Sequence, residues 1–364
     1  MRHIRTWSLF VERAQLPAPR TGRYAPDSAA ANACNAASRS HAGRVLRAYY
    51  GGCGHFEPDT IGITKTLSAR IREGCFGTAT FERDRIVSSD GTTKLLVGLH
   101  RGGSVETVMM PSYREGEAWC CVSSQVGCAM GCDFCASTRN GLERNLEVDE
   151  IVEQYLRVGA VAAEHGRKVR RLVFMGIGEP LHNVDNVLTA IDHIADQGLG
   201  NLGWSRITVS TVGIVQGIER LAKARHPPCL ALSLHAPDDE TRRKIVPTTK
   251  RYDVATILAA ARSYQDATGR IVTLEYCLLA GVNDSDEQAA LLAKRLEGFR
   301  AHVNVIPYNA TGAGLSGVVY MRPSTQAVER FLEQLRARGV NAHARDTRGD
   351  DVAAACGQLR DASA

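Results

Sequence analysis

The hydrophobic pattern after residue 121 repeats a short apolar run followed by an amphipathic stretch. Apolar residues at helical spacing, such as those from Val148 to Leu156, predict helices, whereas the run at 172–175 predicts a short strand. We expect six strand–helix units, with strands at 120–123, 172–175, 207–210, 229–233, 271–277 and 303–306, and helices at 148–156, 184–194, 214–224, 255–268, 287–296 and 325–338. This alternation predicts an α/β fold with a parallel sheet that closes as a partial (βα)6 barrel.

The chain before the barrel begins with two stretches of different character. Residues 1–40 hold six arginines against two acidic residues and show no period, which predicts a mobile arm. A transit-like, arginine-rich segment is the alternative for this arm. Helical patches at 44–50 and 65–72, separated by the glycine-rich break at 51–54, predict a small helical module.

Residues 78–123 alternate between apolar and polar positions, which predicts a β-rich lead-in to the barrel. Its turn signals are Asp90-Gly91 and Gly102-Gly103. The expected parts of the chain are a mobile arm (1–40), a small N-terminal helical and β accessory domain (41–113), the barrel (114–345) and a C-terminal tail (346–364).

The amino-acid composition excludes some classes of protein. Apolar residues make up 44% and charged residues 23%, and no apolar run reaches the ~18 residues of a membrane-spanning helix, which excludes an integral membrane protein. Glu12 and Arg13 interrupt the apolar run near Met1, which argues against a secretion signal, so we expect a cytoplasmic protein. The net charge of +5 suits a polyanionic partner without requiring one.

Eleven cysteines, an odd number, predict metal or redox chemistry rather than a disulfide scaffold. Cys128, Cys132 and Cys135 form a C-x3-C-x2-C run in a glycine-containing loop directly after the first barrel strand. Structural zinc normally takes four protein ligands, and no fourth ligand follows at zinc-ribbon spacing. A [4Fe–4S] cluster held by three cysteines keeps one iron open for a substrate or cofactor. The cluster is therefore favoured, with zinc and unrelated core cysteines as the alternatives.

The same run, with Phe134 before its last cysteine, resembles the signature of radical S-adenosylmethionine (SAM) enzymes. Further motifs are similar, in order, to those of the RlmN/Cfr family of RNA adenine methyltransferases. These motifs lie at 121–128, 174–181, 210–213, 233–238, 306–309 and 348–359. The resemblance implies a barrel of the radical SAM type and an enzyme that methylates an adenine ring carbon of ribosomal or transfer RNA, with C2 favoured over C8.

The resemblance also implies the residues that bind SAM. They are Gly178, Glu179, Ser210, Ser233, Leu234, His235 and Asn309, all at or just after the ends of expected strands, where barrel enzymes place their chemistry. A carboxylate such as Glu179 is a natural partner for the ammonium group of SAM, and a glycine permits close backbone approach. The alternatives are a solvated Glu179, a structural His235 and an Asx-type turn at Asn309.

By resemblance, Cys356 carries the methyl group. Its thiolate would take a methyl from one SAM, and a radical generated from a second SAM would activate that methyl for addition to adenine. Cys121 would then release the RNA by forming a disulfide with Cys356. Cys120 lies directly beside Cys121 and leaves the identity of the resolving thiol open. Glu106 matches the family's proton acceptor, and an exposed strand carboxylate is its alternative.

The implied partners are the RNA substrate and an electron donor such as flavodoxin, with no membrane and a monomeric chain. Basic residues expected to hold RNA phosphates are Arg345, Arg348, Lys250 and Arg251. Two other functions compete with an RNA methyltransferase. A different radical SAM enzyme, such as an activase or small-molecule transferase, would not need both Cys121 and Cys356. A non-catalytic RNA-binding protein with a structural metal would tolerate the loss of Glu179.

Overall fold

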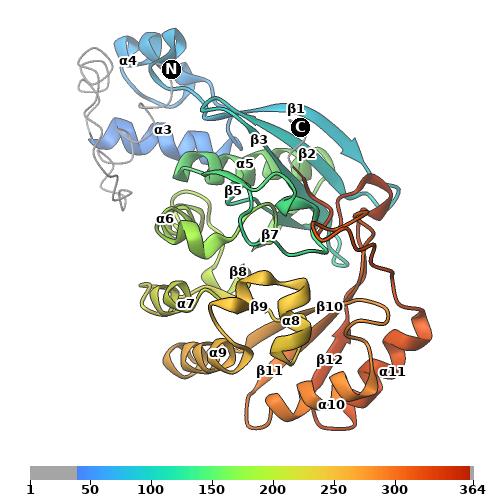
Figure 1. Ribbon diagram of the computed structural model, residues 1–364. Helices are drawn as coiled ribbons and strands as arrows, with labels where there is room; N and C mark the ends of the chain where they lie inside the picture. The colour runs from blue at the N-terminus through green and yellow to red at the C-terminus, as the bar shows by residue number, and fades with distance from the viewer. Residues whose placement is uncertain (1–38, 361–364) are drawn as a thin grey trace.

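The computed structural model describes residues 39–360 (Figure 1). The arm expected over residues 1–40 lies outside the described residues, apart from Arg39 and Ser40, which begin the first described helix. Among the described residues, no helix is both long enough and apolar enough to span a membrane.

One ten-stranded sheet runs through the described chain in the order β1-β2-β3-β4-β7-β8-β9-β10-β11-β12. The strands are β1 (Thr80–Val87), β2 (Thr93–Leu99), β3 (Ser104–Pro111), β4 (Glu117–Cys121), β7 (Lys168–Phe174), β8 (Ile207–Thr211), β9 (Cys229–Ser233), β10 (Val272–Leu278), β11 (Ala301–Pro307) and β12 (Asn341–Ala344). Strands β1 to β4 pair antiparallel, and β4 to β12 pair parallel. A separate hairpin joins β5 (Gln125–Gly127) to β6 (Leu142–Asn145).

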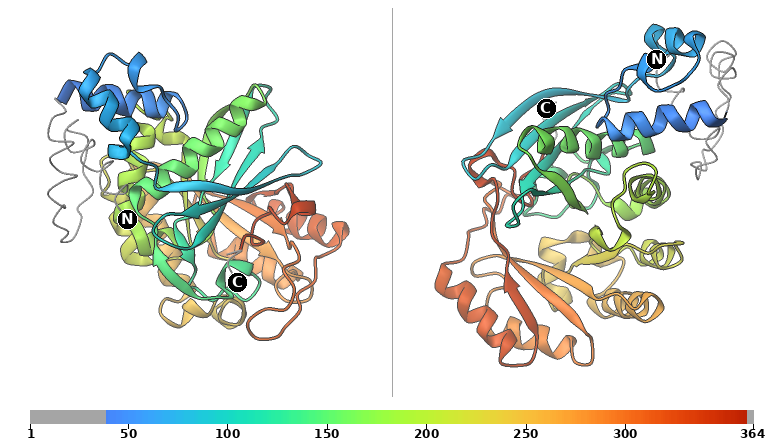
Figure 2. Two further views of the ribbon diagram at one scale, coloured as in Figure 1. Left: turned by 90° about the horizontal axis from the view of Figure 1, so that it is seen from above. Right: turned by 180° about the vertical axis from the view of Figure 1, so that it is seen from behind.

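The six expected strand–helix units are confirmed. Strands β4, β7, β8, β9, β10 and β11 are followed by α5 (Val148–Glu164), α6 (Val184–Ala195), α7 (Val215–Ala222), α9 (Val254–Thr268), α10 (Asp286–Arg295) and α11 (Thr325–Arg336). Figures 1 and 2 show α5, α6, α7 and α9 stacked along one face of the curved sheet. The structure adds α8 (Asp239–Ile245) and a seventh parallel strand, β12, which the hydrophobic pattern did not predict.

The β-rich lead-in forms β1, β2 and β3, with turns at the two predicted positions. Gly91, Gly102 and Gly103 all have positive φ angles, a conformation that favours glycine. Because β3 pairs with β4 in the register Val108↔Cys121, the lead-in continues the barrel sheet across the predicted boundary at residue 113. The division into an accessory domain and a barrel stays a prediction.

The helical module consists of α3 (Arg39–Gly51) and α4 (Lys65–Arg70), the latter continued by a π-helical turn at Ile71–Cys75. Tyr49 on α3 packs edge-to-face on Phe76, and its hydroxyl donates to Glu153 Oε1 on α5 at 2.8 Å. A buried aromatic contact and a buried hydrogen bond therefore attach the module to the first barrel helix.

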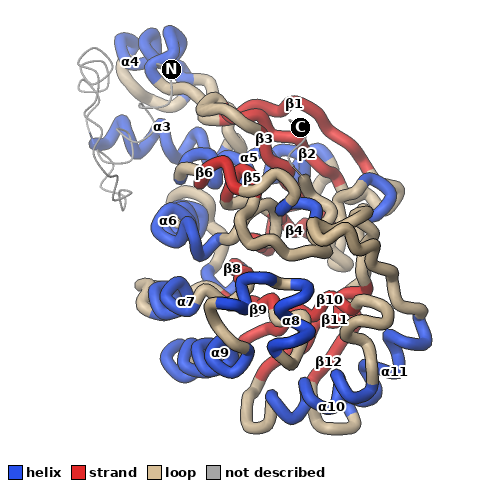
Figure 3. The backbone as a smooth tube through the Cα atoms, in the orientation of Figure 1, coloured by secondary structure: helices blue, strands red, loops and turns tan. Residues whose placement is uncertain are grey.

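The segment after β12 leaves the parallel strands and reaches β1, β2 and β3 (Figure 1), and Figure 3 draws most of it as loop. Gly349 N donates to Asp90 Oδ2 at 3.1 Å, and Lys94 Nζ donates to Ala353 O at 3.1 Å. The lead-in strands thus support the segment that carries Cys356. We call residues 346–360 the tail.

Candidate active site

The loop that carries Cys128, Cys132 and Cys135 follows β5 and lies against the barrel mouth. Asp133 anchors this loop, because its carboxylate accepts hydrogen bonds from Ser316 Oγ at 2.5 Å and from the Tyr320 hydroxyl at 2.7 Å. Gly127 at the start of the loop has a φ of 71°, and a Cβ there would lie 2.0 Å from the Gly141 carbonyl oxygen. Only glycine fits at this position.

The three cysteine side chains line one cavity, which we call the thiol cavity. Burial raises the pKa of the Cys128 thiol to about 12 and also raises the pKa values of Cys132 and Cys135. Free thiols in this setting stay protonated, whereas binding to a metal would draw off their protons. Within residues 39–360, no three potential ligands surround a single metal-ion position; the thiols instead form part of a cavity wall.

Six of the seven residues expected to bind SAM line the thiol cavity. They are Gly178, Glu179, Ser210, Ser233, His235 and Asn309. Leu234 does not line it: its side chain is fully buried, and its backbone N–H donates to the Glu275 carbonyl at 3.0 Å. The C-terminal ends of parallel strands therefore bring these residues to one side of the barrel, as the strand pattern predicted.

Glu179 is buried, so the alternative of a solvated carboxylate is wrong. Its Oε1 accepts from Leu181 N at 3.0 Å and its Oε2 from Val212 N at 2.9 Å. Burial raises the pKa of Glu179 to about 7, although these backbone hydrogen bonds oppose the rise. Gly178 beside it has a φ of 108°, and a Cβ there would lie 2.7 Å from the Cβ of Gln125.

His235 is held in an unusual backbone conformation, with a φ of 61°. Its Nδ1 accepts from Cys277 N at 3.0 Å, and its ring packs edge-on against Phe134 of the cysteine loop. Burial, together with the nearby Arg242 guanidinium, lowers the pKa of His235 to about 3. The imidazole is therefore neutral at physiological pH and connects the cysteine loop to β10.

Asn309 is bonded to the tail rather than to an Asx-type turn. Its Nδ2 donates to the Cys356 carbonyl at 3.2 Å, and its Oδ1 accepts from Arg322 Nη1 at 3.0 Å and from Thr347 Oγ1 at 3.2 Å. The amide therefore fixes the backbone of Cys356 relative to the end of β11.

Cys356 stands between two cavities. It lines the thiol cavity and also a second cavity inside the barrel, so the surface that it exposes faces these spaces. The backbone that follows it is held by the cysteine loop, because Ala136 N donates to Gly357 O at 2.8 Å and Ser137 Oγ donates to Leu359 O at 2.6 Å. Burial raises the pKa of the Cys356 thiol, while the Arg345 guanidinium opposes this rise.

Cys121 is the cysteine of the adjacent pair that faces Cys356. Burial and then the charge of Cys356 raise the pKa of the Cys121 thiol to about 12, which places the two thiols in one electrostatic neighbourhood. Cys120 points to the opposite face of β4, because side chains alternate along a strand. It lies near Tyr155 on α5. Neither Cys120 nor Cys121 lines the two cavities, so the interaction with Cys356 is what distinguishes Cys121. The pleat of β4 thus separates two residues that the sequence alone could not distinguish.

Glu106 is buried on β3, so the alternative of an exposed carboxylate is wrong. Its Oε1 forms an ion pair with Lys94 Nζ at 3.0 Å, and its Oε2 accepts from Arg360 N at 2.9 Å. Glu106 lines neither cavity. These contacts attach the end of the tail to the lead-in strands, and a role for Glu106 as proton acceptor stays a prediction.

The four basic residues expected to hold RNA phosphates fall into two places. Arg345 and Arg348 line the second cavity, whereas Lys250 and Arg251 line a separate small hollow near His182. Arg345 pairs with the Glu275 carboxylate at 3.6 Å, and the Arg348 guanidinium lies 4.5 Å from the centre of the Tyr113 ring. The structure therefore places two of these cations on the wall of a cavity that Cys356 also lines, and Arg345 is the one that acts on the Cys356 thiol.

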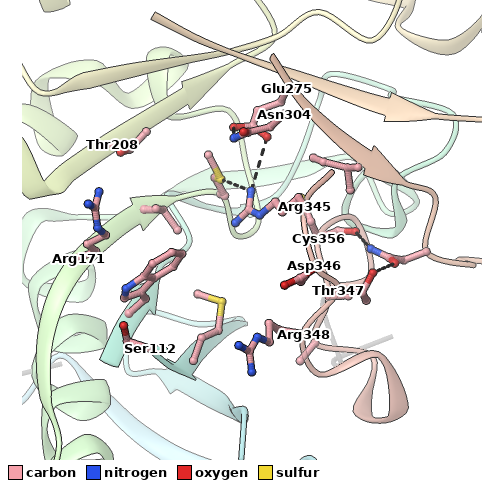
Figure 4. A pocket seen from close by; sticks show the side chains of 18 of the residues that line it. Ser112, Arg171, Thr208, Glu275, Asn304, Arg345, Asp346, Thr347, Arg348 and Cys356 are labelled. Carbon is pink, nitrogen blue, oxygen red and sulfur yellow. Dashed lines mark hydrogen bonds and ion pairs between the residues drawn. The ribbon is translucent and has the colours of Figure 1, made fainter. Parts of the chain in front are cut away.

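The sequence analysis missed the second cavity, which we call the inner cavity (Figure 4). Its wall includes Trp119, Arg171, Glu275, Asn304 and Arg345. One signal was available, because Glu275 interrupts the apolar run of β10, and a lone carboxylate in a buried strand is uncommon. Its neighbours on the wall come from separate strands and carry no shared motif.

Comparisons with known proteins agree on one family. The model of the radical SAM superfamily matches residues 122–293. Over 326 residues the chain is 52% identical to "Probable dual-specificity RNA methyltransferase RlmN 1" of Opitutus terrae, covering 88% of this chain and 91% of that protein. It is 47% identical over 280 residues to the RlmN protein of Thermosynechococcus vestitus, covering 77% and 80% of the two chains. The chain belongs to the RlmN family of radical SAM RNA methyltransferases.

A solved structure extends the agreement to three dimensions. A radical SAM methyltransferase from Sphaerobacter thermophilus is 40% identical and superposes with a TM-score of 0.84 over 90% of this chain and 94% of that chain. The predicted family and fold are therefore confirmed, and membership of the RlmN family makes the chain an enzyme. The alternative of a non-catalytic RNA-binding protein is wrong.

Proposed function

We propose that this RlmN-family enzyme methylates C2 of an adenine in ribosomal or transfer RNA and uses two SAM molecules in each turnover. The observation that carries the proposal is the position of Cys356. It stands between the thiol cavity, which the three loop cysteines line, and a second cavity inside the barrel, with Cys121 close by. A methyl carrier needs access to a methyl donor, to an acceptor and to a resolving thiol.

Cys128, Cys132 and Cys135 would hold the [4Fe–4S] cluster, and the residues present fit this group. Cys128 and Cys132 are buried, Cys135 is half-buried, and all three line the same cavity. Soft thiolate ligands are those that iron–sulfur clusters take. Glu179, Ser210 and Ser233 line the same cavity and would bind SAM at the open iron. When bound, the cluster would supply the electron that cleaves SAM to a 5′-deoxyadenosyl radical.

Cys356 makes the methyl available in a form that adenine can accept. Its thiolate displaces the methyl group from the first SAM, which forms a carbon–sulfur bond and releases S-adenosylhomocysteine. Loss of one hydrogen atom to the radical from the second SAM turns this methyl into a carbon radical. An aromatic C–H carbon is a poor nucleophile for polar methyl transfer, whereas a carbon radical adds to it directly. The immediate product is a radical adduct in which the methylene carbon links the sulfur of Cys356 to the adenine ring. Loss of the adenine C2 proton and of one electron, which the oxidised cluster would accept, restores the aromatic ring and leaves a thioether between Cys356 and the RNA.

Cys121 releases the RNA. Its thiolate attacks the sulfur of Cys356, a disulfide forms, and the carbon–sulfur bond breaks with its electron pair on carbon. That carbon takes up a proton and becomes the methyl group of the product. An external reductant must then reduce the disulfide before the next turnover. In this proposal, Glu106 accepts the adenine proton and an electron donor such as flavodoxin supplies the electron. The enzyme acts as a monomer.

Mass spectrometry of three cysteine variants tests this path. The peptide that contains Cys356 should carry one added methyl group in the wild-type protein, and Cys356→Ala should lose both this mark and RNA methylation. Cys121→Ala should accumulate RNA bound covalently through Cys356. Cys120→Ala is the matched control, because Cys120 faces away from Cys356, and it should turn over nearly normally. A Cys121→Ala enzyme that turns over at the wild-type rate without a trapped adduct would overturn the mechanism.

A further inference from the structure

The inner cavity is separate from the cysteine loop but shares a wall with the thiol cavity. Its wall is built from inward-facing residues of β4, β7, β8, β10 and β11 and from the start of the tail. Cys128, Cys132 and Cys135 do not line it, whereas Cys356 and Glu275 line both cavities. The volume of about 410 Å³ lies within the range of small-molecule sites, roughly 300–1,000 Å³. A ligand bound here would meet Cys356 from the side opposite the cysteine loop.

Glu275 has an unused hydrogen-bond acceptor in this space. The residue is only 4% exposed, and its Oε1 accepts from Asn304 Nδ2 at 3.0 Å. Its Oε2 is buried and has no hydrogen-bond donor among residues 39–360. Arg345 Nη1, at 3.6 Å, gives Oε2 an ion pair but not a hydrogen bond (Figure 4). Because an unsatisfied buried carboxylate oxygen is costly, a ligand N–H that reached Oε2 would bind favourably.

Glu275 Oε2 and Asn304 Oδ1 are two hydrogen-bond acceptors on this wall, and together they favour an amino group over a keto group. Asn304 uses its N–H toward Glu275, so its Oδ1 is also available as an acceptor. The exocyclic amino group of adenine offers two N–H donors, whereas a base with a carbonyl oxygen at the same position would meet like-charged oxygens. The guanidinium groups of Arg171 and Arg345 on the same wall are donors suited to the ring nitrogens of a purine.

The mouth of the inner cavity suits an RNA strand. Tyr113 is 72% exposed, its hydroxyl donates to the Asp346 carboxylate, and Arg348 stacks on its ring. An exposed aromatic ring and a cation are the groups that stack on unpaired bases and contact phosphates. On the same wall, the exposed Arg171 guanidinium lies over the ring of Trp119 at 5.7 Å. The same cavity therefore holds residues suited to contact RNA at its opening, and it is also lined by Glu275 and Cys356.

We propose that the inner cavity receives the target adenine as an unstacked base, and that Glu275 with Asn304 recognises its exocyclic amino group. This inference rests on the proposed function and adds to it the place and the residues that distinguish adenine from other purines. Glu275 would act as a specificity residue that touches the substrate, and the thiol cavity would remain the site of SAM.

Two synthetic RNAs that differ only at the target nucleotide test the inference, after nucleoside mass spectrometry has located that nucleotide. One RNA carries adenosine and the other inosine, which has a keto oxygen in place of the amino group. Sites that hydrogen-bond a substrate group discriminate strongly against analogues lacking it, so the wild-type enzyme should prefer adenosine at least about 100-fold. Glu275→Gln should shift the inosine-to-adenosine ratio at least about tenfold toward inosine, because its amide donates to a keto oxygen.

Cofactor readouts separate recognition of the base from binding of SAM. The 5′-deoxyadenosine yield and the methylation of Cys356 should stay near wild type in Glu275→Gln, and Glu287→Gln on the exposed face of α10 is the matched control. Wild-type enzyme with purine riboside at the target, which lacks the amino group, should be at least about tenfold slower than with adenosine. This arm does not depend on the folding of any variant.

Three results would overturn the inference. An unchanged inosine-to-adenosine ratio in Glu275→Gln would show that Glu275 does not recognise the amino group. Loss of Cys356 methylation in that variant would assign Glu275 to SAM binding. Equal rates for adenosine and purine riboside in the wild type would exclude amino-group recognition altogether. Failure of the proposed function itself would differ, because the wild-type enzyme would then methylate none of the RNAs.

Discussion

The cysteine loop and the tail line the same thiol cavity but are held in place by different forces. The loop packs its cysteines among buried apolar side chains that include Met130, Phe134, Ile245 and Tyr308. The tail depends mostly on hydrogen bonds to distant strands and loops, and its apolar contacts come from the buried Ala354, Ala355 and Leu359 and the half-buried Val352. Hydrophobic packing holds the first region, and polar docking holds the second.

This difference matches what each region has to do in the proposed function. A cluster site must stay intact, and close packing around its ligands opposes rearrangement. Cys356 must receive a methyl group, bond to RNA and then form a disulfide with Cys121, so the tail has to tolerate a change of partner at this thiol. Each hydrogen bond to the tail contributes only about 0.5–1.5 kcal/mol net, since water can replace it. A segment held in this way can leave its site and return.

The largest expected effect comes from breaking the cysteine loop. Cys132→Ala should remove the [4Fe–4S] cluster and abolish SAM cleavage, because the cysteine loop offers only Cys128, Cys132 and Cys135 to hold it. Iron content and 5′-deoxyadenosine formation after anaerobic reconstitution measure this. Cys229→Ala is the matched control, because Cys229 on β9 lines neither the thiol nor the inner cavity. Stoichiometric zinc without iron in anaerobic wild-type protein would contradict the cluster assignment.

A smaller but still large effect should follow from Lys94→Met, which leaves Glu106 buried without its ion-pair partner. Breaking a buried pair on one side costs about 3–5 kcal/mol, and we expect much of this cost to fall on tail docking. RNA methylation should drop about tenfold or more, while the cluster and SAM cleavage remain. Faster alkylation of Cys356 by iodoacetamide would report the release of the tail.

The double variant Lys94→Met/Glu106→Gln sharpens this test. Glutamine can still accept the hydrogen bond from Arg360 N, and no buried charge is left unpaired, so the tail should dock again. Recovery of both docking and RNA methylation would limit Glu106 to positioning the tail. Recovery of docking without methylation would support Glu106 as the proton acceptor. Slow alkylation of Cys356 in the single Lys94→Met variant would contradict the polar-docking account.

The smallest expected effect is that of Ser88→Ala. This variant removes the 2.6 Å hydrogen bond from Ser88 Oγ to the Asp351 carboxylate at the edge of the tail. Ser89 N still donates to the same carboxylate at 3.0 Å, so RNA methylation should change by about twofold or less. Initial rates of methyl transfer measure the change. A loss of methylation as large as that of Lys94→Met would mean that the contacts of Asp351, and not the buried Lys94–Glu106 pair, control docking of the tail.

Local sequence patterns determined the family, the six strand–helix units and the cysteine loop. Helical and strand periods extend over a few residues, and the spacing of Cys128, Cys132 and Cys135 lies within a single loop, so both are visible without a fold. The pattern missed β12 because its four residues contain no apolar run. That strand exists because it pairs with β11 and packs beside α11.

Only the tertiary structure decided how distant residues meet. The pleat of β4 turned Cys121, and not Cys120, toward a thiol 235 positions later in the chain. The register of β2 and β3 and the path of the tail brought Lys94, Glu106 and the backbone of Arg360 together. The pairing of β10 with β11 set Glu275 directly beside Asn304. Such contacts depend on strand register and chain path, which no local period in the sequence encodes.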